Sequence, residues 1–485
     1  MTQNILLIVT DQLTWRALPT YGNTFAHTPN IDRIAQNSVK FDTCYTACPL
    51  CQPARAALWT SKYPHDIDVL SNGRNLPVSR VAQNVATLGE TFANAGYETV
   101  HFGKTHDAGA LRGFAVAAEE EIKVKTENLG VPLNFDTFND RDATEKSVAY
   151  LTNRNKEKPF LMVADLVNPH NICGWVGAFA DDIENPWLCE NLPPLPDNFT
   201  VDDMETRPKA VQYICCSHVR QAQTAKWTPT KFRQYLAAYY AYLAMADAEI
   251  GRILDALAAS GEAENTTVVF FADHGDSMAA RARVTKQVDF YEEVSRVPML
   301  FSGAGVTPRK EALAGLTSLL DLFPTLCGFA GLAVPKGVRG VDLSAALRGG
   351  DLPQRAYVAS EWHTEWGFTI SPGRMIRTPN YKYMRYLENN DIELYDLQND
   401  PLEKTNLGYK PAYRAICQQM EALLQTHLRE TQDDFERLTV LADAHWRSHT
   451  PGYQNHKGIA ARKIKKPHCK GRFCRIAIMA VRAGG

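Results

Sequence analysis

Short runs of consecutive apolar residues alternate with amphipathic segments over much of the chain. Four runs predict strands buried on both faces, at Ile5–Thr10, Glu98–Phe102, Pro159–Leu166 and Thr267–Ala272. Helical periodicity separates them, at Pro29–Ser38, Thr87–Ala95 and Thr230–Ser260. For the last helix we expect Thr228 or Thr230 as the N-cap and Gly261 as the end. This alternation predicts an α/β fold with a large, mostly parallel sheet flanked by helices.

From about residue 356 the polarity alternates residue by residue. Strands are predicted at Arg355–Glu361, Lys382–Tyr386 and Ile392–Asp396, followed by an amphipathic helix at Pro411–Glu430. This pattern indicates a smaller C-terminal α+β subdomain with an antiparallel sheet. We therefore expect a main domain over 1–355, this subdomain over 356–450 and a basic tail over 451–485. The tail is rich in Lys and Arg, which is typical of a solvated segment without a packed core.

Composition and net charge exclude some classes of partner but do not identify a function. The formal net charge of −2 over 485 residues gives no overall attraction to nucleic acid or membrane, and we expect neither as a partner. No signal peptide is visible, so the chain as written is expected in the cytoplasm, or in the periplasm or secreted if a signal was trimmed. The eleven cysteines show no disulfide-framework spacing. Cys48 and Cys51 form a C-x-x-C, but no second Cys/His pair nearby supports zinc or redox chemistry.

Polar residues follow each of the four predicted parallel strands. These clusters are Asp11-Gln12, Gly103–His106, Asn168–Asn171 and Asp273–Asp276. In open α/β sheets, ligands bind outside the carboxyl ends of the strands. One polar loop alone is more often a solvated loop, but four at the same topological position predict a shared site.

Two of these clusters supply metal-binding chemistry. Asp11, Gln12, Asp273 and His274 offer two carboxylates, one amide oxygen and one imidazole. Oxygen-rich sites suit calcium, with magnesium or manganese as alternatives. The acids could instead cap helices, but two acids in one cleft repel each other without a cation. We therefore expect one divalent metal, calcium above the others.

A nucleophile and several cations complete the candidate chemistry. Pro53 and the helix-forming run after it place Cys51 near a helix N-terminus, which favours anions. Arg55 follows one turn later and can donate charged hydrogen bonds to an oxyanion. The cationic or proton-transferring side chains expected at the same edge are Lys104, His106, His170 and Lys286. These residue types suit an anionic ester whose leaving oxygen gains charge in the transition state.

The ordered motifs resemble the type I, formylglycine-dependent sulfatases of the alkaline phosphatase superfamily. The resemblance rests on Asn4–Asp11, Thr28–Asp32, Cys51–Arg55 through Tyr63–His65, Gly103–His106, Asn168–His170, Asp273–Asp276, Phe290–Pro298 and Glu393–Asn406. It implies an alkaline phosphatase/sulfatase-like fold. It also implies a sulfuric ester hydrolase that releases sulfate, and the substrate expected is a sulfated small molecule or glycan. Its nucleophile would be a formylglycine made from Cys51 by a formylglycine-generating or sulfatase-maturing enzyme.

The same resemblance assigns roles position by position. Asp11, Asp273, His274 and the modified Cys51 would bind the metal, whereas Gln12 stands where relatives often have a second Asp. The expected sulfate and nucleophile contacts are Arg55, Lys104 and Asn72, the leaving-group residues His170 and Lys286, and the base His106. Candidate contacts to a sugar or its carboxylate are His363, Arg374, Trp175, Trp362 and Trp366, although core aromatics and surface polar residues are the commoner explanation.

Three features leave the substrate open. Gln12 resembles the phosphonate monoester and phosphodiester hydrolase branch, which would use the same machinery. Arg281 resembles choline-sulfatase-like members. Asn168–Cys173 resembles bacterial enzymes that act on sulfated carbohydrates, the substrate class we expect. A non-catalytic binding protein on this fold should have lost its nucleophile, metal acids or cations, and this chain keeps all three.

Overall fold

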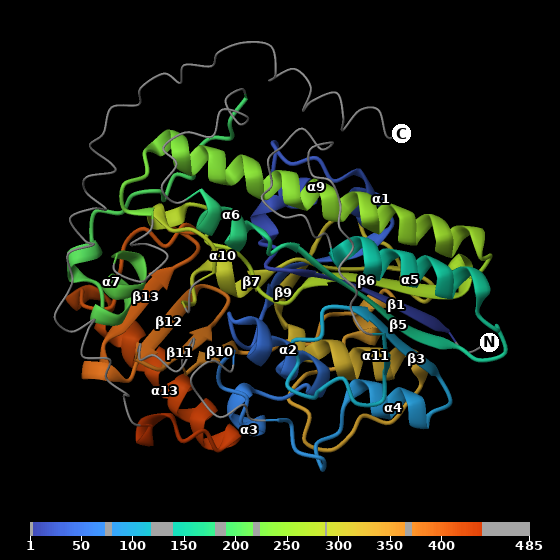
Figure 1. Cartoon of the computed structure of the whole chain (residues 1–485). Coiled ribbons are helices and arrows are strands. Elements are labelled where there is room, and N and C mark those ends of the chain that lie inside the picture. Colours follow the sequence, from blue (N-terminus) through green and yellow to red (C-terminus); the bar gives the residue numbers. More distant parts are fainter. Residues whose placement is uncertain are drawn as a thin grey trace, which may run out of the picture.

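A sheet of nine strands, seen near the centre of Figure 1, carries the polar edge expected from the sequence. The computed structural model describes residues 3–72, 80–117, 139–179, 191–216, 224–286, 289–363 and 371–438. Within these ranges the strand order is β4-β3-β5-β1-β6-β8-β2-β7, and β9 pairs with β2. The bounds are β1 (Asn4–Asp11), β2 (Ser38–Tyr45), β3 (Glu98–Gly103), β4 (Ala115–Val116), β5 (Phe160–Pro169), β6 (Thr266–Ala272), β7 (Arg296–Val297), β8 (Met299–Gly303) and β9 (Leu313–Ser318).

The four strands predicted from apolar runs are neighbours in this sheet. β3, β5, β1 and β6 pair in parallel, with Ile5 opposite both Leu161 and Thr267. Their carboxyl ends therefore meet at one edge, which confirms the predicted α/β class. The prediction omitted β2, β7 and β8, which extend the sheet through antiparallel pairs. In β2, Lys40 and Asp42 interrupt the apolar run because they lie at half-buried and exposed positions.

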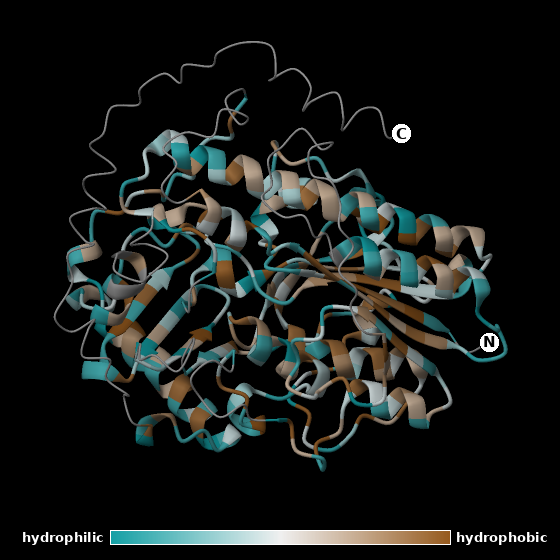
Figure 2. Cartoon of the chain, viewed as in Figure 1, coloured by the Kyte–Doolittle hydropathy of each residue, from teal (hydrophilic) through white to brown (hydrophobic). Residues whose placement is uncertain are grey.

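Helices cover both faces of the sheet (Figure 1). One face carries α1 (Pro29–Gln36), α5 (Asn139–Asn153), α6 (Ile172–Ala178) and α9 (Pro229–Ala259), and the other carries α2 (Cys51–Thr60), α4 (Leu88–Asn94) and α11 (Leu322–Ala330). Thr228 caps α9, because its side-chain oxygen accepts a hydrogen bond from the Lys231 backbone N–H at 3.2 Å. Figure 2 shows the strands of the large sheet as a largely hydrophobic layer between these helices. Other α-helices of the described ranges include α3 (Pro64–Ile67), α7 (Lys209–Cys216), α10 (Glu292–Ser295) and α12 (Ser344–Leu347).

A second, antiparallel sheet follows, as predicted, but it has four strands, and the strand at Gly373–Arg377 was not among the three predicted. Its order is β10 (Val358–Trp362), β11 (Gly373–Arg377), β12 (Tyr381–Tyr386) and β13 (Ile392–Asp396). Helix α13 (Arg414–Thr431) covers one face, where Leu424 and Phe435 pack against Ile376 and Leu394. On the opposite face of this sheet, alternate side chains of the strands pack against residues of the larger unit, including Tyr45 and Phe290. The smaller sheet is thus held between its own helix and the larger unit.

Three boundaries of the prediction have different outcomes. The first C-terminal strand begins at Val358 rather than at Arg355, whose guanidinium forms an ion pair with Asp321. The division at 355/356 stays a prediction, and residues 451–485 lie outside the described ranges. Across the described helices, none has both the length and the apolar character that crossing a bilayer requires.

Candidate active site

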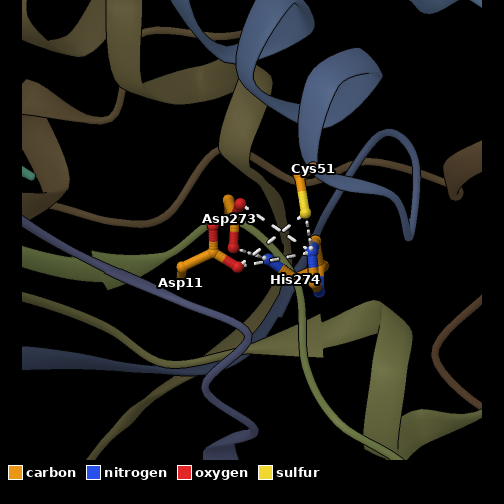
Figure 3. Close-up of side chains that lie close together, drawn as sticks. All are labelled: Asp11, Cys51, Asp273 and His274. Atoms are coloured by element: carbon orange, nitrogen blue, oxygen red, sulfur yellow. Dashed lines mark hydrogen bonds and ion pairs between the residues drawn. The ribbon is translucent and has the colours of Figure 1, made fainter. Parts of the chain in front are cut away.

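Four buried side chains converge where β1 and β6 end and α2 begins (Figure 3). Asp11 is the last residue of β1, Cys51 is the first of α2, and Asp273 and His274 follow β6 directly. Each offers one ligand atom, and these atoms all lie within 4.8 Å of one another. The loop after β6 comes this close to α10 because residue 275 is glycine: a Cβ there would overlap the carbonyl oxygen of Glu293.

The candidate ligand atoms of this cluster lie close together, and the His274 imidazole has a lone pair free to bind a cation. The Cys51 Sγ lies 3.2 Å from His274 Nε2 and 3.8 Å from Asp11 Oδ1. His274 Nδ1 lies 2.9 Å from the Gly275 carbonyl oxygen, so Nδ1 carries the proton and the Nε2 lone pair faces the acids. Burial, aided by nearby lysines, lowers the pKa of His274 to about 3 and keeps it neutral. Two carboxylates and a neutral imidazole therefore fit a divalent metal.

The Arg55 guanidinium lies beside this cluster and forms ion pairs with its acids. Its guanidinium contacts Asp273 at 2.9 Å, Asp165 at 2.5 Å and Asp11 at 3.1 Å, and all four side chains are almost fully buried. Burial would raise the pKa of Asp273, but neighbouring cationic groups, Arg55 among them, outweigh it and hold the pKa below its usual range. In this structure Arg55 thus orients the acids that would bind metal, whereas the sequence predicted contacts with the nucleophile and sulfate.

Two lysines contact residues of this cluster. Lys286 Nζ lies 2.8 Å from Cys51 Sγ and 3.0 Å from the Gln12 side-chain oxygen. Lys104 Nζ pairs with Asp11 Oδ2. Burial and the charge of Lys286 lower the pKa of Lys104 to about 8. Of the two predicted lysines, Lys286 therefore contacts position 51 directly, and Lys104 contacts the metal-site acid Asp11.

His106 and His170 lie at the same edge and share an electrostatic environment. Burial and the charge of Lys104 lower the pKa of His106 to about 4. Burial and the charge of Lys286 lower the pKa of His170 well below its usual value. Both imidazoles are therefore neutral at pH 7. A neutral His106 can accept a proton, as its predicted role as a base requires.

The remaining predicted contacts fall into two places. Asn72 accepts a hydrogen bond from the Gln52 backbone N–H at 3.0 Å and so holds the first turn of α2. His363 and Arg374 lie in a second buried cluster with His65, Glu361 and Asp433. There Arg374 makes two hydrogen bonds to Asp433, at 2.5 and 2.9 Å, and one to His363 at 3.1 Å. The Arg374 guanidinium and the nearby His65 imidazole balance the negative charge of these acids.

Some sequence-based candidates prove to be structural. Trp175 and Trp362 have no exposed surface, so they are core residues, which the sequence analysis gave as the commoner explanation, and not sugar contacts. Arg281, the residue that resembles choline-sulfatase-like members, is also fully buried, stacked on Tyr291 and paired with Glu293, so in this structure its contacts are with the protein core. Trp366 lies outside the described residues.

The structure adds two acids to which the sequence analysis gave no role. Asp165, in β5, holds Arg55 and also lies 3.3 Å from His101 Nε2. Asp276 accepts a hydrogen bond from the Gln12 side chain at 2.7 Å. An acid inside the apolar run 159–166 was a visible signal for Asp165. The role of Asp276 depends on its distance from Gln12 and had no such signal.

Comparison with known proteins identifies the chain. A sequence model described as sulfatase matches residues 3–332. The chain belongs to the sulfatase family. A second model, described as N-sulphoglucosamine sulphohydrolase, C-terminal, matches residues 285–430 of this sulfatase. Members of the family use a divalent metal and a formylglycine, which agrees with the convergence of Asp11, Cys51, Asp273 and His274.

Two relatives and one solved structure show how far the similarity extends. The sulfatase is 44% identical to a Delta 4,5-hexuronate-2-O-sulfatase of Bacteroides thetaiotaomicron over 96% of each chain. It is 27% identical to a choline-sulfatase of Rhizobium meliloti over 84% of this chain and 83% of the relative. The solved structure of a 2-O GAG sulfatase matches with a TM-score of 0.88 and 43% identity, over 93% of this chain and 97% of the other. The predicted family, fold class and sulfatase activity are therefore confirmed.

Proposed function

We propose that this sulfatase removes the 2-O-sulfate group of a Δ4,5-unsaturated hexuronate in a glycosaminoglycan fragment. The observation that carries the proposal is 44% identity to a hexuronate-2-O-sulfatase across 96% of both chains. The fold agreement with a 2-O GAG sulfatase supports it, at a TM-score of 0.88. The paired cations Lys104 and Lys286 suit a substrate that carries an anionic sulfate beside a carboxylate.

The metal in this proposal is calcium, because carboxylate oxygens dominate the donor set. Asp11, Asp273, His274 and the formylglycine derived from Cys51 would hold it. When bound, the ion would supply charge neutralisation for the sulfate oxygens. The formylglycine, produced by a formylglycine-generating or sulfatase-maturing enzyme, supplies the nucleophilic oxygen in its hydrated form.

The chain's own residues divide the remaining work. Lys104 and Lys286 would orient the sulfate, Lys286 from its contact with position 51 and Lys104 from its contact with Asp11. Of the two candidates for protonating the leaving oxygen, Lys286 contacts position 51 directly, with its Nζ 2.8 Å from Cys51 Sγ, and would be the proton donor. His170 is neutral and would act as a hydrogen-bond partner to the leaving oxygen. His106, also neutral, would accept the proton released at position 51.

The substrate proposal is tested with a panel that separates sulfate position from sulfate chemistry. Protein is co-expressed with a maturing enzyme, and the mass of the tryptic peptide Phe41–Arg55 first establishes the aldehyde at Cys51. Sulfate release is then measured on an unsaturated disaccharide sulfated at the hexuronate 2-O, on the matched disaccharide sulfated only at the amino-sugar 6-O, on choline sulfate and on a phosphonate monoester.

We expect kcat/KM on the 2-O-sulfated disaccharide to exceed each of the others by at least about 100-fold, since sites that pair buried polar groups discriminate strongly. Equal or faster turnover of the 6-O isomer would contradict the hexuronate assignment. Preference for choline sulfate or the phosphonate would replace it with one of those activities.

A further inference from the structure

Gln12 follows the metal-site residue Asp11, and its carboxamide has a donor end and an acceptor end in fixed positions. The side-chain nitrogen donates to Asp276 Oδ2 at 2.7 Å, and the side-chain oxygen accepts from Lys286 Nζ at 3.0 Å. Gln12 and Asp276 are fully buried, and Lys286 is 7% exposed. A carboxylate only accepts and an ammonium only donates, so this orientation of the amide is the one that satisfies both neighbours.

Asp276 is itself held in place by donors on its other oxygen. The Tyr235 hydroxyl and the Met278 backbone N–H, the latter at 2.9 Å, both donate to Asp276 Oδ1. Tyr235 in turn accepts from the Thr285 backbone N–H at 2.8 Å, one residue before Lys286. The acid therefore belongs to a hydrogen-bond network that also holds the backbone next to Lys286.

The Lys286 ammonium ends this chain of contacts at the reacting position. It donates to Cys51 Sγ at 2.8 Å, where Cys51 stands for the formylglycine of the mature enzyme. The contacts thus run from Asp276 through the Gln12 amide to Lys286 and on to residue 51. An unlocked amide could turn its nitrogen toward Lys286 and repel the ammonium from this place.

We propose that Asp276 is a positioning residue that locks the Gln12 carboxamide with its oxygen toward Lys286, and so holds the Lys286 ammonium against residue 51. Gln12 then serves as the acceptor for Lys286 rather than as an essential metal ligand. This inference rests on the role proposed above for Lys286. It gives a function to Gln12 and Asp276, which have no direct part in the proposed reaction.

The test is a double-mutant cycle between Asp276→Asn and Gln12→Met. Methionine has nearly the length of glutamine but cannot accept from Lys286 or donate to Asp276. Each single variant should lower kcat by about 10–100-fold, the usual cost of removing an outer hydrogen-bond partner. The metal content of the purified protein, measured by mass spectrometry, should stay at the wild-type value. In the Gln12→Met background, Asp276→Asn should have no further effect, because its influence passes through the lost amide.

Two reference variants make the outcomes distinguishable. Asp247→Asn alters another buried acid, which accepts from the backbone N–H groups of Asn30 and Ile31 at the start of α1, and should lower the melting temperature with kcat unchanged. Lys286→Ala should lower kcat at least as far as Asp276→Asn. All rates are measured on the fastest ester of the panel above, so the test does not depend on the identity of the glycan.

Three results would overturn the inference. Additive losses in the double variant would show that Asp276 acts independently of Gln12. Loss of metal in Gln12→Met would make Gln12 a metal ligand instead. If Asp276→Asn keeps full activity while Lys286→Ala is impaired, the positioning role of Asp276 is rejected and the role of Lys286 stands. If Lys286→Ala keeps full activity, the role of Lys286 and the positioning role of Asp276 are both rejected. If Asp276→Asn does not fold, unchanged kcat in Gln12→Met is sufficient to reject the inference.

Discussion

At the scale of single residues, Cys51 contacts both the metal-site residues and the cationic residues of the site. Cys51 is 1% exposed, begins α2, and contacts His274, Lys286 and Asp11. Burial raises the pKa of its thiol, and the Lys286 charge opposes this. A buried thiol in this setting is a weak nucleophile, which agrees with a family that replaces the thiol before catalysis.

Cys51→Ala should abolish sulfate release and leave the fold intact. Removing a catalytic nucleophile commonly lowers kcat by more than about 10⁴-fold. Alanine favours the helix and leaves the ion pairs of Arg55 with its three acids in place. The check is sulfate release together with a melting curve. Turnover within about 10-fold of wild type would exclude Cys51 as the source of the nucleophile.

Asp273→Asn should weaken metal binding by at least about 10-fold, the lower range found even for groups outside the ligand sphere. The amide keeps the shape of the side chain but removes a charge that both the metal and Arg55 meet. Titration of metal-free protein with calcium in a calorimeter measures the affinity. Unchanged affinity would remove Asp273 from the ligand set, with Asp247→Asn as the control for loss of a buried acid elsewhere.

At the scale of secondary-structure elements, the second cluster joins α3 to the smaller sheet. His65 in α3 places Nδ1 2.6 Å from Glu361 in β10 and Nε2 3.2 Å from the Thr431 carbonyl oxygen at the end of α13. Both ring nitrogens thus face acceptors, as a protonated imidazole requires. Burial lowers the pKa of His65, but Glu361, Asp433 and Asp66 outweigh burial and raise it to about 9.

This raised pKa predicts a loss of stability in mildly alkaline solution. His65 has a folded-state pKa of about 9 against 6.5 for the ordinary side chain, so its contribution is complete below pH 6.5 and lost as the pH rises through 9. The free energy of unfolding should fall by up to about 3 kcal/mol over that window. Urea titrations from pH 6 to 9.5 measure it. His65→Gln should flatten the slope, and an equal slope in that variant would assign the effect to other groups.

At the scale of the whole molecule, buried charges join the two sheets. Lys382 of β12 lies 3.0 Å from Glu292 of α10 and 2.9 Å from Glu403, and all three side chains are almost fully buried. Glu292 belongs to the large unit that carries the active site, and α10 packs beside the loop after β6 through the contact of Gly275 with Val294. The smaller sheet therefore contacts α10, next to the active-site loop after β6, through ion pairs as well as through apolar contacts.

Lys382→Ala should lower the free energy of unfolding by about 3–5 kcal/mol, because it removes the cation closest to two buried carboxylates and leaves only their longer ion pairs with Arg296 and Arg281. Equilibrium urea unfolding measures the loss. The matched control is Lys410→Ala at a lysine that lines the surface pocket beside Tyr409, where a change within about 0.5 kcal/mol is expected. A loss below about 1 kcal/mol for Lys382→Ala would show that the acids find other partners.

The sequence by itself determined the features that depend on neighbouring residues. Four apolar runs predicted β1, β3, β5 and β6, and the polar residues behind them predicted the common edge, because strand ends and their loops are continuous in the chain. Pro53 and the helix-forming run likewise placed Cys51 at the start of α2. The family followed from the order of these motifs.

Tertiary structure alone decided what depends on distances between segments far apart in the chain. The antiparallel strands β2, β7 and β8 are recognised by their partners and not by their own pattern. The sequence predicted that Arg55 contacts the nucleophile and the sulfate, and only the fold shows that its guanidinium also lies against Asp11, Asp165 and Asp273, which come from three different strands or their ends. The orientation of the Gln12 amide is set by Asp276 and Lys286, more than 260 positions away. A hydrogen bond or ion pair forms only when folding brings both partners within about 3 Å, and local sequence does not encode that distance.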